Sequence, residues 1–337
     1  MQNRAHVLIV VPCLNEAAVL PSLLAQLAAE NPDALIVVAD GGSTDGSQGI
    51  VAGFAALHAN VRLLDNPGRL QSIGINRAVD QFGAGREWLV RVDAHCAYPA
   101  DYVGLLLAAA DRAGAACVVV PMLTKGFGCF QQAAAAAQNS LLGTGGAAHR
   151  HAVHHAAAGK YVDHGHHALM RLDRFVAVGG YDEGFSHNED AELDVRLVQA
   201  GARLWLEPSA AIVYFPRQSA AALWRQYRGY GRGRARTVAK HGIRLKRRQL
   251  LPLCVAPAVA TAAIGAGLAV LWPPAAVLLL PALVWMAVCL GYGLLLGLIA
   301  RSACAGAAGV AAMVMHLAWS LGYWRGSLGA HGRGAPG

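Results

Sequence analysis

Acidic residues stand at three places where residue type and position allow chemistry. Asp40 begins the stretch DGGSTDGS, Asp93 closes the apolar run WLVRVD, and Glu189-Asp190 open NEDAELDVRLVQAGARL. A carboxylate at a strand end accepts hydrogen bonds from a nucleobase or ribose, or holds a divalent cation against a diphosphate. A carboxylate at a helix start is placed to accept a proton from a hydroxyl group. The pattern is therefore compatible with an enzyme that uses a nucleotide.

Each of these acids also has an ordinary structural explanation. Asp40 is a typical cap in a strand-to-helix turn, Asp93 fits a turn without metal, and acids at a helix start are stabilised by the helix dipole. Glu192 and Asp194 are expected to face solvent. A dinucleotide-binding fold is the rival explanation for Asp40, but no GxGxxG follows the first apolar run. Taken singly, the acids leave binding and structural roles open.

His95 lies two residues after Asp93, within RVDAH. The two side chains are candidate ligands of a divalent cation, Mg²⁺ or Mn²⁺, that would neutralise a diphosphate. Neutral imidazole suits Mn²⁺ better than Mg²⁺. We therefore expect a divalent cation as cofactor and leave the choice of ion open.

Histidines are concentrated in one segment of the chain. Seven of the fourteen lie between His149 and His167, in HRHAVHH and DHGHHA. Their spacing matches no familiar zinc pattern, and the segment contains no cysteine. We expect a polar loop at the acceptor site, including His166 and His167, with metal binding as the alternative.

The elements that must position these side chains follow from alternating patterns over residues 7–120. Apolar runs predict strands at 7–11, 34–39, 61–64, 88–92 and 117–120, and helices are expected near 16–30, 46–57, 70–82 and 101–112. Such alternation is typical of an α/β protein with a Rossmann-like, mainly parallel sheet covered on both faces. Ligands bind beyond the carboxyl ends of its strands, where Asn15-Glu16, Asp40 and Asp93 are expected.

Charge divides the chain at Glu207. All twenty Asp and Glu lie at or before it together with fourteen Lys and Arg, whereas fourteen Lys and Arg and no acid follow it. The first part thus carries −6 and the second +14, within a total of +8. A nucleic-acid-binding domain is expected to be basic, so we expect no nucleic-acid partner. Seven widely spaced cysteines without a CxxC pair argue against a disulfide framework or zinc site and fit a reducing compartment.

Three apolar segments follow, at about 250–272, 273–300 and 303–324. Each is near the roughly 20 residues that span a bilayer, so core helices of a soluble domain are the weaker explanation. Basic residues at 244–248 precede the first segment, and by the positive-inside rule they place the preceding domain in the cytoplasm, at the inner membrane. A third crossing would put Arg325 outside, so a re-entrant or interfacial placement stays open for the last segment.

Residues 218–240 show an amphipathic helical pattern that suits either a membrane interface or a solvated surface. Within it, QYRGYGRGRAR is too rich in glycine and arginine for a simple helix. Arg228, Arg232 and Arg234 either clamp a diphosphate or face anionic lipid head groups. We thus expect a catalytic domain at 1–217, a basic interfacial segment at 218–248 and a membrane region of two to three spans at 249–326.

The order of the motifs is more specific than any one of them. VPCLNE, DGGSTDGS, NPGRLQSIGINRAV, RVDAH, VGGYDEGFSHNED and QYRGYGRGRART together resemble the family 2 glycosyltransferases over residues 6–240. The second half, including VDHGHHALMR and YFPR, looks closest to the glucosyltransferases of the ExoA type in succinoglycan biosynthesis. The resemblance implies a GT-A fold and inversion at the anomeric carbon.

The resemblance also implies roles for individual residues. Asp190 stands at the catalytic base with Glu189 beside it, and Asp93 and His95 stand at the metal-binding DxD motif. The nucleotide-sugar site would further include Pro12, Asn15, Glu16, Asp40 and Arg69, with Gln226, Arg228 and Arg232 at the QxxRW motif of processive members. Two departures matter: His95 replaces an Asp, and QYRGY lacks the Arg-Trp pair, which favours transfer of a single sugar.

On this resemblance we expect a UDP-sugar donor, UDP-glucose by likeness to the ExoA type, and a glycan acceptor on a polyprenyl diphosphate in exopolysaccharide synthesis. A membrane and polysaccharide-assembly proteins would be the partners. A polyprenyl-phosphate glycosyl synthase, whose phosphate acceptor needs no base, is one alternative. Another is a membrane-docked nucleotide-sugar sensor or scaffold without activity, for which His95 in the metal motif would be the sign.

Overall fold

The computed structural model describes residues 3–146 and 158–331 of the chain. These residues form two compact units. The first contains the described residues up to Leu123 and those from 158 to Tyr214, and the second contains residues 124–146 and those from Phe215 onward. The stretch HRHAVHH, part of the expected acceptor loop, lies outside the described residues.

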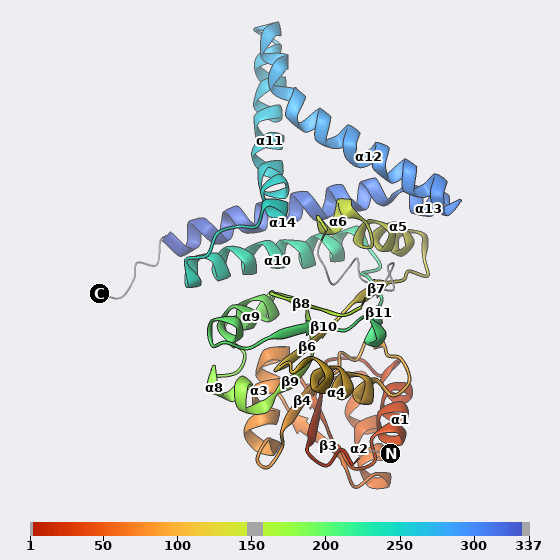
Figure 1. The fold of residues 1–337 in the computed structure, drawn as a ribbon. Coiled ribbons are helices and arrows are strands. Elements are labelled where there is room, and N and C mark those ends of the chain that lie inside the picture. Colours follow the sequence, from red (N-terminus) through yellow and green to blue (C-terminus); the bar gives the residue numbers. More distant parts are fainter. Residues whose placement is uncertain (1–2, 147–157, 332–337) are drawn as a thin grey trace. The chain divides into compact units, whose positions relative to one another are not determined.

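The first unit is built on an eight-stranded sheet in the order β3-β2-β1-β4-β9-β6-β10-β8 (Figure 1). Its strands are β1 (Val7–Cys13), β2 (Leu35–Asp40), β3 (Val61–Asp65), β4 (Trp88–Arg91), β6 (Cys117–Val120), β8 (Lys160–Val162), β9 (His166–Arg171) and β10 (Leu204–Leu206). The pairs β1–β2, β2–β3, β1–β4 and β6–β10 are parallel, and β9 runs antiparallel between β4 and β6. The expected mainly parallel α/β sheet is confirmed.

Helices follow the strands as expected. They are α1 (Leu20–Glu30), α2 (Ser47–Leu57), α3 (Gln71–Phe82) and α4 (Tyr102–Ala113). They bury both faces of the central strands, so that residues 7–11 of β1 have no exposed surface, as is typical of a parallel sheet. The in-register partners Cys13–Asp40 and Asp40–Asp65 show that β1, β2 and β3 end at the same edge of the sheet. The loops expected to bind a ligand leave from that edge.

Two further elements of the first unit carry chemistry. Strand β9 brings His166 and His167 into the sheet next to β4 and β6, and helix α9 (Glu189–Gln199) begins with the pair Glu189-Asp190. The remaining elements are α8 (Leu172–Ala177), η1 (Pro208–Ala210) and a three-stranded sheet of β5 (Cys96–Ala97), β11 (Ile212–Tyr214) and β7 (Met122–Thr124).

The second unit is helical. Its elements are α5 (Cys129–Gln138), α6 (Leu141–Thr144), α10 (Ala220–His241), α11 (Arg247–Ala269), η2 (Pro273–Leu279), α12 (Leu280–Ala300), α13 (Ala303–Gly306) and α14 (Ala308–His331). Three stretches among the described residues are long and apolar enough to cross a membrane: Arg247–Ala269, Pro273–Ala300 and Ala303–Leu328. Figure 1 shows α11 and α12 as a hairpin, with α14 running beside α10. The three expected apolar segments are therefore helical.

The Gly- and Arg-rich stretch belongs to one continuous helix, α10, so the expectation that it is not a simple helix is wrong. Its glycines are buried where α14 packs against it. A Cβ at Gly231 would lie 2.0 Å from the Trp319 carbonyl oxygen, and one at Gly322 would lie 2.1 Å from that of Arg228. Glycine lowers helix propensity, but here it lets two helix backbones touch, and the packing outweighs the propensity.

Four of the five arginines of α10 are exposed, whereas its three glycines are buried. Arg225, Arg228, Arg232 and Arg236 are exposed. Spacings of three and four residues place them along one side of the helix, which we call the α10 arginine face. Because no Asp or Glu follows Glu207, no acid of the later chain can neutralise this face.

Helix α11 contains Pro257, and α14 satisfies the backbone group that this proline leaves without a partner. Proline has no N–H, so the Leu253 carbonyl four residues earlier loses its helical hydrogen bond. Ser320 Oγ and Trp324 Nε1 donate to that carbonyl at 2.8 and 3.0 Å. Ser320 Oγ also accepts from the Ala256 N–H at 3.0 Å. Such compensation is required of a proline-containing helix in a membrane interior.

Ser320→Ala is expected to destabilise the protein by about 1–3 kcal/mol, because it removes the hydroxyl that accepts from the buried Ala256 N–H, while the Leu253 carbonyl keeps Trp324 Nε1 as a donor. The thermal unfolding midpoint of the purified chain in detergent should fall accordingly. Ser327→Ala is the matched control, since Ser327 Oγ donates to Tyr323 within its own helix. Equal midpoints for the two variants would show that α14 does not stabilise α11 in this way.

Cys129 of α5 and Cys304 of α13 form a disulfide with an S–S distance of 2.08 Å. The cysteine spacing argued against a disulfide framework, and this one bond corrects that expectation. The two residues lie 175 positions apart. Sequence spacing does not reveal the pair, because only the packing of α5 and α13 in the same unit brings the sulfur atoms together.

Candidate active site

Two loops at the carboxyl ends of β1 and β2 are hydrogen-bonded to each other. Asn15 Oδ1 accepts from the Thr44 N–H at 2.8 Å, and the Asn15 N–H donates to Ser43 Oγ at 2.8 Å. The Glu16 N–H donates to Ser47 Oγ at 3.0 Å. Asn15 has a φ of 58°, a backbone conformation that non-glycine residues seldom adopt and that clusters at functional sites. The predicted residues Asn15 and Glu16 thus lie against the DGGSTDGS loop.

Asp40 is only 1% exposed at the end of β2. Its Oδ1 accepts from the N–H groups of Gly42 and Ser43, both at 2.9 Å, and from Gln48 Nε2 at 2.7 Å. Burial raises the pKa of Asp40, but hydrogen bonds from Ser43, Gln48 and Gly42 outweigh it and keep the pKa below its ordinary value. The ionised carboxylate shapes the turn, and the nucleotide contact stays a prediction.

Arg69 lies against this turn. It has a φ of 56°, and a Cβ built at Gly42 would lie 3.7 Å from one of its guanidinium nitrogens. Gly42 has a φ of 82°, so a larger residue there would be strained. The structure therefore brings Arg69 next to the loop that follows Asp40.

Residues of the β1 and β4 loops also meet. His95 Nδ1 lies 3.2 Å from Glu16 Oε1. Pro12, within β1, pairs in register with Ala39 of β2. Residues 3–146 and 158–331 contain no group of three His, Cys, Asp or Glu placed to hold a metal ion. Asp93 and His95 thus remain a candidate pair of ligands without a third protein ligand in the part described.

A buried arginine that sequence analysis missed joins two of the predicted acids. Arg91 ends β4, and its side chain is 4% exposed. Its Nε donates to Asp93 Oδ1 at 2.9 Å, its Nη2 donates to Asp93 Oδ2 at 3.3 Å, and its Nη1 donates to Asp190 Oδ1. Arg91 is the last residue of β4, and Asp93 follows it two residues later, just beyond the strand. One guanidinium thus connects the predicted metal motif with the predicted base.

The adjacent acids Glu189 and Asp190 have opposite electrostatic environments. Burial raises the pKa of Asp190, but Arg91 and then the neighbouring histidines outweigh it, and the pKa lies below its ordinary value. Burial, together with the Asp190 charge, raises the pKa of Glu189 to about 7. At neutral pH Asp190 is ionised while Glu189 is partly protonated. Of the two carboxylates, Asp190 therefore stays ionised over the wider pH range.

His166 and His167 lie within strand β9, so the expectation of a loop is wrong for them. Both are buried, and His167 has no exposed surface. His166 Nε2 lies 3.8 Å from Asp93 Oδ2, and burial lowers the pKa of His166 to about 4. His167 Nε2 lies 2.6 Å from Asp194 Oδ1, and its Nδ1 lies 3.0 Å from Tyr181 Oη. Both histidines are therefore buried next to acids, His166 near Asp93 and His167 against Asp194.

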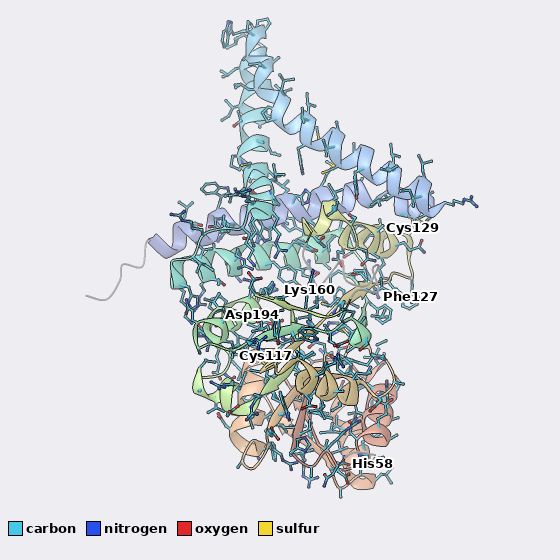
Figure 2. The ribbon with its side chains drawn as sticks, in the orientation of Figure 1. His58, Cys117, Phe127, Cys129, Lys160 and Asp194 are labelled. Carbon is cyan, nitrogen blue, oxygen red and sulfur yellow. A yellow bond between two sulfur atoms is a disulfide. The ribbon has the colours of Figure 1, made fainter. Side chains whose placement is uncertain are left out.

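Asp194 and Glu192 are buried, so the expectation that they face solvent is wrong. Asp194 Oδ2 lies 2.5 Å from His164 Nδ1, and its pKa falls to about 2 because its pairing with His167 and His164 outweighs burial. Figure 2 labels Asp194 on α9 and Cys117 on β6. Burial, and after it the charge of Asp194, raises the pKa of the Cys117 thiol to about 12. Glu192 pairs with Arg196 at 2.6 Å. Internal partners explain why both acids tolerate burial.

Four residues of this cluster were not predicted from the sequence: Arg91, Tyr181, His164 and Asp194. Two had a usable signal. Arg91 precedes Asp93 by two positions at the end of an apolar run, and Asp194 is four positions from Asp190 on a helix, where it shares a face with that predicted acid. Tyr181 and His164 lie on other segments, and no periodicity in the sequence shows that these segments come close to the predicted acids.

Gln226, Arg228 and Arg232 belong to α10 in the second unit. Gln226 Nε2 donates to Tyr230 Oη at 2.9 Å within that helix. Arg228 and Arg232 are part of the α10 arginine face.

Comparison with known proteins gives a consistent result. Residues 8–158 match the model of the family described as glycosyl transferase family 2. The chain is 51% identical over 321 residues to the succinoglycan biosynthesis protein ExoA of Rhizobium meliloti (strain 1021), with 94% of each chain covered. It is thus similar to ExoA along almost its whole length.

Two solved structures share the fold. One is the mannosyltransferase PcManGT from Pyrobaculum calidifontis in complex with GDP-Man and Mn²⁺, with a TM-score of 0.52, 18% identity and coverage of 83% of this chain and 86% of that one. The other is S. aureus TarS 1-349 in complex with UDP-GlcNAc, with a TM-score of 0.50, 16% identity and coverage of 72% and 69%. At these identities the likeness concerns the fold alone.

The GT-A fold expected from the motif order is confirmed by these neighbours together with the mainly parallel sheet. Sequence identity above one half across almost the full length decides the family. The chain belongs to glycosyltransferase family 2, is a glycosyltransferase, and lies close to ExoA.

Proposed function

We propose that this enzyme transfers one glucose, with inversion, from UDP-glucose to a glycan carried on a polyprenyl diphosphate, in exopolysaccharide synthesis of the succinoglycan type. The similarity to ExoA, a succinoglycan biosynthesis protein, supports the pathway. Glucose is the sugar that the resemblance to the ExoA type implies. The UDP-GlcNAc complex of TarS, which has the same fold, supports a UDP-sugar donor. The observation that carries the proposal is the ionised Asp190, held by Arg91 at the start of α9.

Asp190 is the general base of this reaction. Its side chain is 18% exposed, so an acceptor hydroxyl reaches it. As the hydroxyl loses its proton to Asp190, its oxygen bonds to the anomeric carbon from the face opposite UDP, and the bond to UDP breaks. Glu189 lies beside it, and its raised pKa of about 7 leaves it partly protonated at neutral pH.

The donor nucleotide binds at the sheet edge formed by the β1 and β2 loops. Pro12, Asn15, Glu16 and Asp40 shape this edge, and Arg69 brings a positive charge to it. A guanidinium suits the diphosphate because it donates two parallel hydrogen bonds to phosphate oxygens.

A divalent cation would be held by Asp93 and His95 and would neutralise the charge that develops on the leaving diphosphate. A carboxylate with an imidazole suits Mn²⁺, and the Mn²⁺ complex of PcManGT supports this ion. Asp93 already shares its charge with Arg91. The protein therefore places one fixed positive charge at this position whether or not the cation is bound.

The second unit holds the enzyme at its lipid acceptor. The three apolar helical stretches would anchor it, and the basic residues at 244–248 favour a catalytic unit on the cytoplasmic side of the inner membrane. The α10 arginine face, with Gln226 beside it, would bind the phosphates of the membrane-borne acceptor. Polysaccharide-assembly proteins would be the further partners.

Membranes containing the enzyme and its glycan-lipid precursor are expected to incorporate label from UDP-glucose into the organic-soluble lipid, and not from a panel of other radiolabelled UDP-sugars. EDTA should stop the incorporation and Mn²⁺ should restore it. Product analysis by mass spectrometry should show one added hexose. Full activity in EDTA would exclude the cation from the mechanism.

The same assay separates the alternative functions. Label on polyprenyl phosphate itself, without a glycan, would identify a polyprenyl-phosphate glycosyl synthase. Binding of UDP without transfer to any lipid would identify a nucleotide-sugar sensor or scaffold.

A further inference from the structure

A chain of hydrogen bonds leads from Asp190 into the interior of the first unit. Tyr181 Oη donates to Asp190 Oδ1 at 3.2 Å and lies 3.0 Å from His167 Nδ1. His167 Nε2 lies 2.6 Å from Asp194 Oδ1. Because the Asp194 carboxylate is ionised, it accepts a hydrogen bond, so Nε2 of His167 carries the hydrogen. In the neutral ring Nδ1 is then the acceptor that faces Tyr181.

Arg91 creates a difficulty for Asp190 as the only base. The ion pair keeps Asp190 charged, but a carboxylate with a lowered pKa holds a captured proton weakly. His167 has the opposite property: burial lowers its pKa, but Asp194 outweighs burial and the pKa lies above its ordinary value. A proton captured by Asp190 is therefore more stable on His167.

We infer that His167 is the final recipient of the substrate proton, and that Tyr181 passes the proton from Asp190 to it. The inference rests on the proposed role of Asp190 as base. In this scheme Tyr181 and His167 are positioning residues that act through Asp190. The Asp194 carboxylate stabilises the protonated imidazole of His167.

The proton movements balance. The substrate O–H bond breaks as an Asp190 O–H bond forms. Once Asp190 is protonated, its O–H donates to Tyr181 Oη, and the phenol O–H turns from Asp190 Oδ1 to His167 Nδ1. The Asp190 proton then moves to Tyr181 Oη while the phenol's own proton moves to His167 Nδ1. The step leaves an ionised Asp190, a neutral Tyr181 and an imidazolium at His167 paired with Asp194. After the products leave, water reaches Asp190, whose side chain is 18% exposed, and the proton returns along the same two bonds.

The charged and titratable groups around His167 are compatible with this role. They are Asp190 and Asp194 of α9, Arg91 of β4, Tyr181 after α8, His166 of the same strand and His164, which shares Asp194. The neighbouring strand β6 places Val119 in register with His167 and Cys117 near Asp194. The two carboxylates favour the imidazolium and Arg91 opposes it. His166 and Cys117, with pKa values of about 4 and about 12, do not titrate near neutral pH. Glu189, beside Asp190, does titrate there, with a pKa of about 7, and its effect on kcat should persist in variants that remove the limb due to His167.

Tyr181→Phe tests the transfer step, because it removes the bridging oxygen and keeps the Arg91–Asp190 and His167–Asp194 pairs. We expect kcat for UDP release by the full-length enzyme to fall about tenfold or more, with KM for the UDP-sugar changed less than about twofold. Tyr161→Phe is the matched control, since Tyr161 donates to the Ala113 carbonyl and contacts none of these groups. It should keep the wild-type kcat.

The pH profile of kcat distinguishes a relay from a structural role. Only neutral His167 accepts a proton, so wild-type kcat should rise with pH through the His167 pKa. Asp194→Asn removes the charge that raises this pKa and should shift the acid limb by about one unit or more to lower pH. In Tyr181→Phe, and in His167→Gln as a second variant, the limb due to His167 should be absent.

A purely structural role predicts lower activity with the acid limb at its wild-type pH. That result in Asp194→Asn, or wild-type kcat in Tyr181→Phe, would overturn the inference. UDP release is measured with water as acceptor where no lipid is added, using whichever UDP-sugar the wild type cleaves fastest. Failure of the proposed function would appear separately, as wild-type membranes that do not label lipid from UDP-glucose.

Discussion

Asp190→Asn is expected to lower the rate of sugar transfer about 10²–10⁴-fold while UDP-sugar binding stays near the wild-type level. Asparagine has nearly the same shape but accepts no proton from the acceptor hydroxyl. Arg91 keeps Asp93 as a partner at 2.9 Å, so the substitution does not leave a buried cation alone. Initial rates of lipid labelling and UDP titration of the purified full-length chain measure the two quantities.

Asp173→Asn is the matched control for this substitution. Its carboxylate is 58% exposed and pairs with Arg171, so activity should not change. Glu189→Gln should cost less than Asp190→Asn, because Glu189 is already partly protonated near neutral pH. A folded Asp190→Asn enzyme with wild-type turnover would contradict the base assignment. It would favour an acceptor that needs no deprotonation, such as a lipid phosphate.

The sheet was predictable from the sequence because its strands are buried on both faces. Runs such as VLIVV at 7–11 have no polar position, and only a covered parallel strand tolerates that. The antiparallel entry of β9 between β4 and β6 was not predictable. The histidines of β9 suggested a polar loop, because the sequence pattern does not show that Asp93, Asp194 and Tyr181 are their buried partners.

The candidate site divides in the same way. Acids at strand ends and at a helix start stand out, since those positions have a general chemical meaning. The cation between them does not stand out, because Arg91 precedes Asp93 within an apolar run and reads as a strand residue. Asp194 looked like a solvent-facing helix position only because its partner His167 lies on a different element.

The second unit shows a local rule overridden by packing. Glycines in QYRGYGRGRAR argue against a helix when α10 is considered alone. Against α14 the same glycines allow close contact, as the short distances from Gly231 and Gly322 show. The helix therefore depends on a partner about 90 residues later in the chain, which a window along the sequence does not include.

Arg91→Met is expected to have the largest effect on stability among these variants, about 3–5 kcal/mol. It leaves the Asp93 and Asp190 carboxylates in a buried site without their shared cation. Arg171→Met is a close control, because Arg171 also binds the acid two residues later through Nε and Nη2, at 3.1 and 3.3 Å. That pair is 41% and 58% exposed, so its loss should cost about 0.2–1 kcal/mol.

The dependence on pH identifies the cause of the Arg91→Met effect. In the wild type the Arg91 guanidinium outweighs burial and holds the pKa values of Asp93 and Asp190 below their ordinary range. Their contribution to stability is therefore present above the unfolded pKa, near 3.9, and is lost only in more acidic solution. Without the cation, burial raises both pKa values above 3.9, and the contribution is instead lost as pH rises through them.

The gap in thermal midpoint between wild type and Arg91→Met should therefore widen from pH 5 to pH 8, whereas the gap for Arg171→Met should stay constant. Glu189 has a pKa of about 7 in the wild type, so its ionisation makes the thermal midpoint depend on pH. This dependence is the same in the wild type and in Arg171→Met, and it therefore cancels from the gap between them. A constant gap for Arg91→Met would mean that Arg91 stabilises the fold through packing of its side chain. A widening gap would show that the charge needed to keep the base ionised also holds this part of the fold together.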